Sequence, residues 1–81
     1  MKKVFIFSIC STCNEPVGMI DPCNELGYNA FPTTNFHGEK SIEETEQIRL
    51  DLIDLLKKEG KFDQAESIER YSKVIEITFT I

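Results

Sequence analysis

The sequence predicts a small α+β fold in which strands at the two ends of the chain pair with each other. An irregular Cys/His segment stabilised by zinc, one long amphipathic helix and one short helix lie between these strands. Residues 3–9 and 74–81 are rich in apolar and β-branched side chains, residues 41–60 repeat apolar side chains with a helical period, and residues 10–40 show no period. The 81 residues fit a single domain, 1–81.

Residues 3–9 form the first predicted strand. Phe5 and Phe7 lie on one of its faces and Val4 and Ile6 on the other, so both faces are apolar, as in a strand that is covered on both sides. The sequence leaves open whether the chain itself or a second copy covers the outer face.

Residues 74–81 form the closing strand, which we expect beside the first. Its side chains alternate, so that Ile75, Ile77 and Phe79 share one face. We expect the main helix to pack on that face.

The main helix spans residues 41–60. It opens with a capping box, in which the Ser41 hydroxyl accepts from the third helical N–H and the Glu44 carboxylate reaches back. Gly60 supplies a left-handed residue at its end. A short helix over residues 63–72 follows.

The irregular segment contains every cysteine of the chain and its only histidine. These residues are Cys10, Cys13, Cys23 and His37. Zinc takes four tetrahedral ligands of these types, and a Cys-x-x-Cys on a tight turn supplies two of them. Asn14 suits the left-handed residue that such a turn needs. We therefore predict a structural zinc ion held by these four side chains, with a short hairpin over residues 26–31 and 33–36.

Other interpretations of the same residues stay open. In a thiol–disulfide oxidoreductase, Cys10 would be the attacking thiolate and Cys13 the resolving thiol. In a purely structural interpretation, Cys23 is a packed thiol and His37 a surface imidazole. His37 also begins a His-x-Glu sequence like that of the zinc deaminases, but the Cys-x-x-Cys precedes it and does not follow it.

Charge limits the classes of partner. The net charge of −5 disfavours nucleic-acid binding, which needs a basic face. The acidic side chains of the main helix predict docking charges for a protein with a basic surface. They are Glu43, Glu46, Asp51 and Asp54.

Taken together, these features predict a non-catalytic regulatory or inhibitory module that binds a protein partner in the cytoplasm, away from membranes. The apolar run near the start of the chain is shorter than a secretory signal requires. The partner and the oligomeric state stay open.

Overall fold

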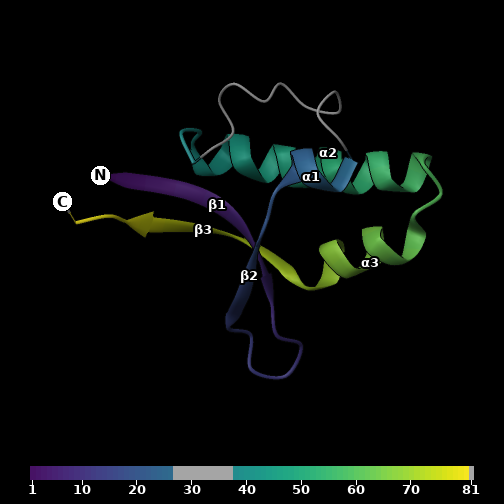
Figure 1. The fold of residues 1–81 in the computed structure, drawn as a ribbon, viewed down its shortest axis with the longest axis horizontal. Helices are drawn as coiled ribbons and strands as arrows, with labels where there is room; N and C mark the ends of the chain where they lie inside the picture. The colour runs from purple at the N-terminus through teal and green to yellow at the C-terminus, as the bar shows by residue number, and fades with distance from the viewer. Residues whose placement is uncertain (27–37, 81) are drawn as a thin grey trace.

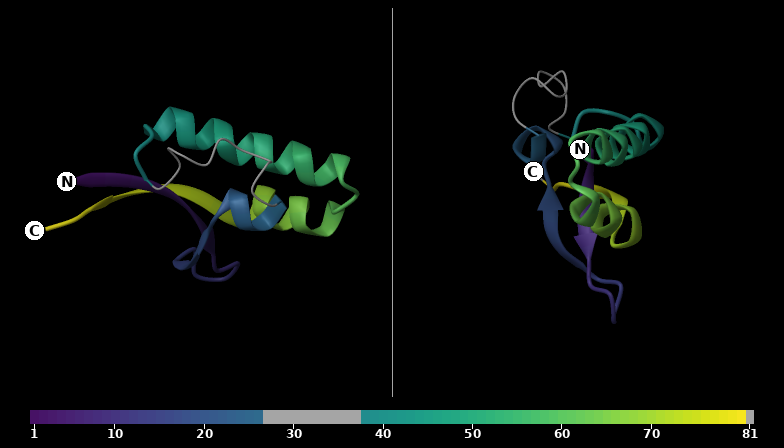
Figure 2. Two further views of the ribbon diagram at one scale, coloured as in Figure 1. Left: turned by 45° about the horizontal axis from the view of Figure 1, so that its top comes forward. Right: turned by 90° about the vertical axis from the view of Figure 1, so that its right-hand side faces the viewer.

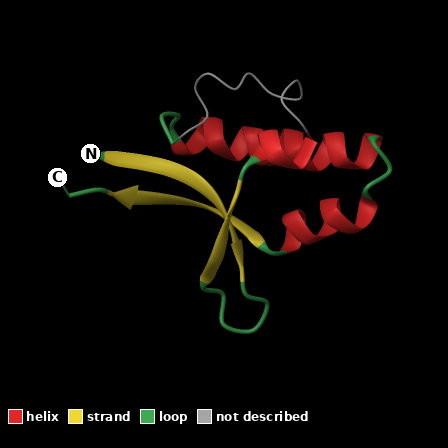
Figure 3. Ribbon diagram, in the orientation of Figure 1, coloured by secondary structure: helices red, strands yellow, loops and turns green. Residues whose placement is uncertain are grey.

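The computed structural model describes residues 1–26 and 38–80. The elements follow in the order β1 (Lys2–Ile9), β2 (Pro16–Ile20), α1 (Pro22–Leu26), α2 (Ile42–Lys58), α3 (Phe62–Arg70) and β3 (Ser72–Thr78). Figure 1 shows α2 and α3 as an antiparallel pair of helices joined by a short turn. The predicted α+β class is confirmed, as the helices and strands of Figure 3 show. Among the described helices, none combines the length and the hydropathy of a membrane span.

The sheet has three strands in the order β2-β1-β3. The central strand, β1, runs antiparallel to both neighbours, so the predicted pairing of the first and last strands is confirmed. Beyond the strands, the Phe79 N–H donates to the Met1 carbonyl at 2.7 Å. Met1 and Phe79 therefore lie side by side, next to the paired strands β1 and β3 (Figure 1).

One face of the sheet carries the hydrophobic core. Val74 and Ile20 both lie opposite Ile6, one on each side of it, and paired residues of antiparallel strands point to the same face. The helices cover this face (Figure 2). The buried cluster consists of Ile6, Ile20, Leu52, Ile53, Leu56, Ala65 and Ile68.

The prediction that the main helix packs on the face of Ile75, Ile77 and Phe79 is wrong. Ile75 pairs with Phe5 and Ile77 with Lys3, so both point to the side opposite the core. Phe79 lies beyond the end of β3 and is exposed. Because both faces of the first strand are apolar, alternation in the last strand alone could not say which face the helices cover.

The predicted capping box holds the first turn of α2. The Glu44 N–H donates to Ser41 Oγ at 3.2 Å, and the Ser41 N–H donates to Glu44 Oε1 at 3.4 Å. At the other end, Gly60 has a φ of 78° and its N–H donates to the Lys57 carbonyl, as its predicted left-handed role requires. The chain then enters α3, whose buried residues complete the core.

Residues 10–40 are not irregular throughout. The strand β2 pairs with β1, and α1 follows it directly. This strand has only five residues and includes Pro16 and Gly18, so it gives little periodic signal. Proline is tolerated there because it begins an edge strand. Leu26, the first residue of the predicted hairpin, ends α1, and the rest of that hairpin lies outside the described residues.

Candidate functional site

The turn between β1 and β2 brings Cys10 and Cys13 together. The Asn14 N–H donates to the Cys10 carbonyl at 3.0 Å, and the Cys10 N–H donates to the Glu15 carbonyl at 2.9 Å. Asn14 has a φ of 59°, the left-handed conformation that the sequence predicts. A tight turn brings residues three apart to within about 7 Å at their Cα atoms, so Cys10 and Cys13 lie close together. Both cysteines therefore present their thiols at the tip of the hairpin.

The thiol of Cys10 is surrounded by hydrogen-bond donors. Its Sγ lies 3.1 Å from Thr12 Oγ1. The Thr12 hydroxyl, followed by the backbone N–H groups of Cys13 and Thr12 and by the Cys13 side chain, lowers the pKa of Cys10 from 9.0 to about 6. These donors favour the charged form of the sulfur. These surroundings favour the thiolate form of Cys10.

Cys23 has a different environment at the start of α1. Its N–H donates to Asp21 Oδ1 at 2.9 Å. Burial and the negative charge of Asp21 raise the pKa of the Cys23 thiol. The five residues of β2, at about 3.3 Å each, separate this thiol from the hairpin tip, and Figure 1 shows α1 and the tip at opposite ends of the strand.

The structure brings the predicted zinc ligands together only in part. Cys10 and Cys13 share a turn, Cys23 lies at the far end of β2, and His37 lies outside the described residues. Within residues 1–26 and 38–80, no three Cys, His, Asp or Glu side chains gather as a metal site would need. The zinc site of four residues stays a prediction.

The acidic side chains predicted to dock on a partner have two different surroundings. Glu43, Asp51 and Asp54 are exposed on α2. Glu46 is half-buried, and its Oε1 lies 2.8 Å from Arg49 Nη2. Glu46 therefore helps to hold Arg49 in place, whereas the other three carboxylates face solvent.

The sheet face opposite the core, here called the outer face, is largely apolar. Its apolar residues are Phe5, Phe7, Ile9, Met19, Ile75 and Ile77, with Val17 on the same side by alternation along β2. Two lysines share this face, Lys3 opposite Ile77 and Lys73 opposite Phe7. The rings of Phe5 and Phe7 meet edge to face with centroids 6.3 Å apart. Val17 is 68% exposed and Met19 is 60% exposed. Helices α2 and α3 lie on the other side of the sheet (Figure 2).

Sequence reasoning recognised the apolar outer side of β1 but missed Val17 and Met19. The only sequence pattern that could have revealed them is the alternation along residues 17–20. It places Val17 and Met19 on one face of a strand and Ile20 on the other. An alternation over so few residues is weak evidence for a strand.

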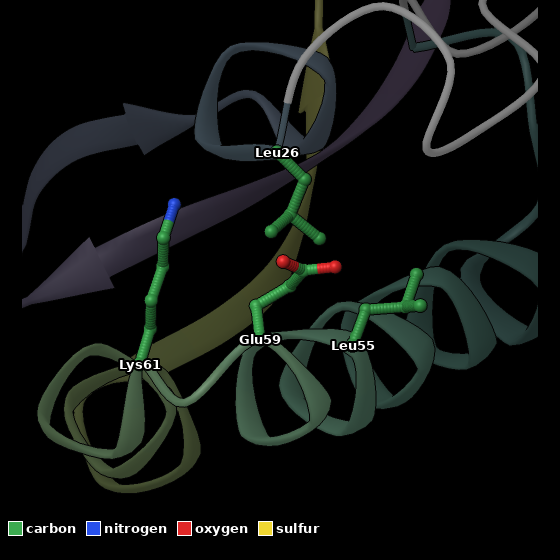
Figure 4. A pocket seen from close by; sticks show the side chains of 4 residues that line it. All are labelled: Leu26, Leu55, Glu59 and Lys61. Atoms are coloured by element: carbon green, nitrogen blue, oxygen red, sulfur yellow. The ribbon is translucent and has the colours of Figure 1, made fainter.

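A pocket of about 250 Å³ opens between α1 and the turn that joins α2 to α3. Figure 4 shows Leu26 and Leu55 on its apolar side and Glu59 and Lys61 on its charged side. Most sites for small molecules enclose about 300–1,000 Å³ and bury their ligand. This shallow hollow is below that range, so it is a weaker candidate than the hairpin tip or the outer face.

Comparison of the chain with protein-family models, with curated proteins and with solved structures found no match. Two features of the chain remain as candidate functional sites, the paired thiols at the hairpin tip and the outer face of the sheet.

Proposed function

We propose that this chain is a non-catalytic protein-binding module that binds its partner through the outer face of the sheet. The observation that carries the proposal is the exposure of Val17 and Met19, 68% and 60%, next to the half-buried ring of Phe7. Large contiguous apolar patches are uncommon on soluble monomers and mark interaction surfaces.

The energetic gain from covering this face is substantial. Complete burial of a valine or methionine side chain contributes about 1.5–3 kcal/mol. Val17 and Met19 keep most of their surface in water, so a partner that covers them removes apolar area that folding has left exposed. The partly buried rings of Phe5 and Phe7 extend the same surface along β1.

The edge of β2 adds a second kind of contact. β2 is an edge strand of the sheet, and among the described strands it pairs only with β1. The backbone groups on its other edge can hydrogen bond to an extended segment of a partner. An apolar face beside such an edge is the arrangement that peptide-binding sheets use.

A second candidate surface is the exposed side of α2. The carboxylates of Glu43, Asp51 and Asp54 face solvent there, on the opposite side of the sheet from Met19. They are the candidate contacts for a partner with a basic surface, and binding of that kind weakens steeply with added salt. A regulatory or inhibitory role, with a zinc ion ordering the loops, belongs to this proposal as well.

Site-specific photo-crosslinking distinguishes the two surfaces. A photoreactive amino acid replaces Met19 in one variant and Leu50 in the other, since Leu50 is an exposed apolar residue of α2 and serves as the matched position. In cells that naturally produce the chain, we expect a discrete protein adduct from position 19 and none from position 50. The additional change Val17→Lys should abolish the adduct from position 19.

The opposite pattern overturns the proposal. Adducts from position 50 alone, weakened by salt, would favour the acidic side of α2. Equal adducts from both positions, or none from either, would show that the outer face has no dedicated partner. Circular dichroism of each variant checks that the fold is retained.

A further inference from the structure

A second activity is suggested at the hairpin tip, on residues that the proposed protein contact does not use. We propose that Cys10 and Cys13 form a reversible dithiol–disulfide centre that exchanges with small disulfides of the glutathione type. The β1–β2 turn that holds this pair is separate from the outer face, so the two proposals can be tested independently.

The turn holds both cysteines at a spacing that a disulfide can bridge. The hydrogen bonds from Asn14 to Cys10 and from Cys10 to Glu15, at 3.0 and 2.9 Å, fix the backbone on either side of the pair. A disulfide needs Cα atoms about 4.4–6.8 Å apart, and a tight turn brings residues three apart to within about 7 Å. The turn therefore places the two cysteines near the range that a disulfide bridges.

The surroundings of the pair suit exchange with a dissolved molecule. Cys13 is exposed, and Cys10, like Cys23, is half-buried. The contact between Cys10 Sγ and Thr12 Oγ1, at 3.1 Å, places a hydroxyl beside the sulfur that attacks. The hairpin tip projects from the end of the sheet opposite α1 (Figure 1), so a small disulfide made of two tripeptides can approach it.

The reaction has two exchanges. The Cys10 thiolate attacks one sulfur of the small disulfide, which forms a mixed disulfide on Cys10 and releases one small thiolate. Cys13 then loses its proton to solvent and attacks Cys10 Sγ, which forms the Cys10–Cys13 bond and releases the second small thiolate. Two electrons pass from the cysteines to the small disulfide, which ends as two molecules of thiol.

Cys23 provides an internal control. It lies at the other end of β2, half-buried and beside the Asp21 carboxylate, which accepts from its backbone N–H. The negative charge and the partial burial both disfavour attack by this sulfur. Cys23 should therefore stay reduced while the hairpin pair is oxidised.

Incubation of the reduced full chain with glutathione disulfide, followed by acid quenching and peptide mapping by mass spectrometry, tests the proposal. We expect the wild-type chain and Cys23→Ser to lose two hydrogens and to contain a Cys10–Cys13 disulfide. We expect Cys13→Ser to stop at a stable mixed disulfide on Cys10. Added dithiothreitol should restore the reduced chain in each case.

Three results would overturn the proposal. The wild-type chain could stop at mixed disulfides, Cys23 could react as fast as Cys10, or both hairpin thiols could stay unmodified because they hold a metal ion that a chelator must first remove. Circular dichroism before and after oxidation checks that the reaction occurs on the folded chain.

Discussion

Arg49 Nη2 lies 2.8 Å from Glu46 Oε1, one turn away on α2, and Arg49 Nη1 donates to the Ile68 carbonyl in α3 at 3.3 Å. The same nitrogen lies 3.2 Å from Ser72 Oγ at the start of β3. The Arg49 side chain is only 15% exposed, so these hydrogen bonds are largely shielded from water. One guanidinium therefore joins α2 to the junction of α3 and β3.

Replacement of Arg49 by alanine should destabilise the fold. The change leaves the Ile68 carbonyl and the Glu46 carboxylate without this donor, and the loss of hydrogen bonds to a charged group costs about 1.5–3 kcal/mol. Urea unfolding measures the change in free energy. The control is Arg70→Ala, which removes an exposed ion pair with Glu66 that should contribute at most about 1 kcal/mol. Equal losses in the two variants would contradict the bridging role of Arg49.

The parts of the fold that depend on local sequence could be predicted. The capping box of Ser41 and Glu44 needs only residues one turn apart, and the helical period over α2 is long. The face on which α2 packs could not be predicted, because it depends on the register that sets Val74 opposite Ile6. Both faces of β1 are apolar, so only pairing across the sheet distinguishes them.

Gly38 makes a close contact that no other residue type fits. A Cβ at this position would lie 2.7 Å from Phe5 Cζ and 2.8 Å from Lys3 Cβ, and the φ of Gly38 is 83°. The left-handed conformation alone costs an L-residue about 1–2 kcal/mol, and the clash adds to that cost. Thermal unfolding should show a larger loss for Gly38→Ala than for Gly60→Ala.

The two control glycines separate the two causes. Gly60 has a φ of 78° but nothing within 4 Å of an added Cβ, so it reports backbone strain alone. At Gly18, an added Cβ would lie 3.7 Å from Ser8 Oγ, so Gly18→Ala should be tolerated. A Gly38→Ala variant as stable as Gly60→Ala would show that both Phe5 and Lys3 make room for the added Cβ without cost.

Of the candidate site, only the turn that contains Cys10 and Cys13 could be predicted, because a short sequence motif determines it. Cys10 and Cys13 fall on one turn because Asn14 supplies its left-handed residue. The place of Cys23 depends on β2, which runs away from that turn and carries Cys23 to its far end. The sequence of β2 gives no periodic signal, so the strand could not be predicted. The spacing of the cysteines alone therefore could not show that Cys23 lies far from Cys10 and Cys13.

The reactivity of Cys10 should depend on pH differently from that of Cys23. The donors around Cys10 lower its pKa to about 6, whereas burial and Asp21 raise that of Cys23 above 9.0. The rate of alkylation by iodoacetamide, measured at each cysteine by mass spectrometry, should therefore reach its plateau above neutral pH for Cys10. For Cys23 the rate should still be rising at pH 9. Thr12→Val removes the largest cause and should move the Cys10 midpoint upward.

The same shift predicts how stability changes with pH. The pKa of Cys10 is about 6 in the folded chain, below its ordinary value of 9.0. The Cys10 thiolate therefore contributes fully to the stability of the fold above pH 9.0, and this contribution is lost as the pH falls through about 6. The wild-type chain should gain stability over Cys10→Ser as the pH rises between these values. A constant difference across that range would mean that the unfolded chain holds the thiolate equally well.

Zinc binding can be tested with variants of the same cysteines. A site of four ligands needs Cys23 and His37 as well as the hairpin pair, so Cys23→Ser would release the metal if that site forms. If the site forms, Cys13→Ser should release the zinc as well. Because Cys23 lies at the far end of β2, a Cys23→Ser chain that keeps the zinc content of the wild-type chain after purification without chelator would show that the four-ligand assignment is wrong. Elemental analysis with a zinc-sensitive dye gives the stoichiometry. Loss of zinc from Cys23→Ser and His37→Ala alike would confirm the site of four residues. Formation of that site would also require α1 to move from the position described here. Metal binding would then be coupled to folding, so removal of the metal by a chelator would change the circular dichroism spectrum.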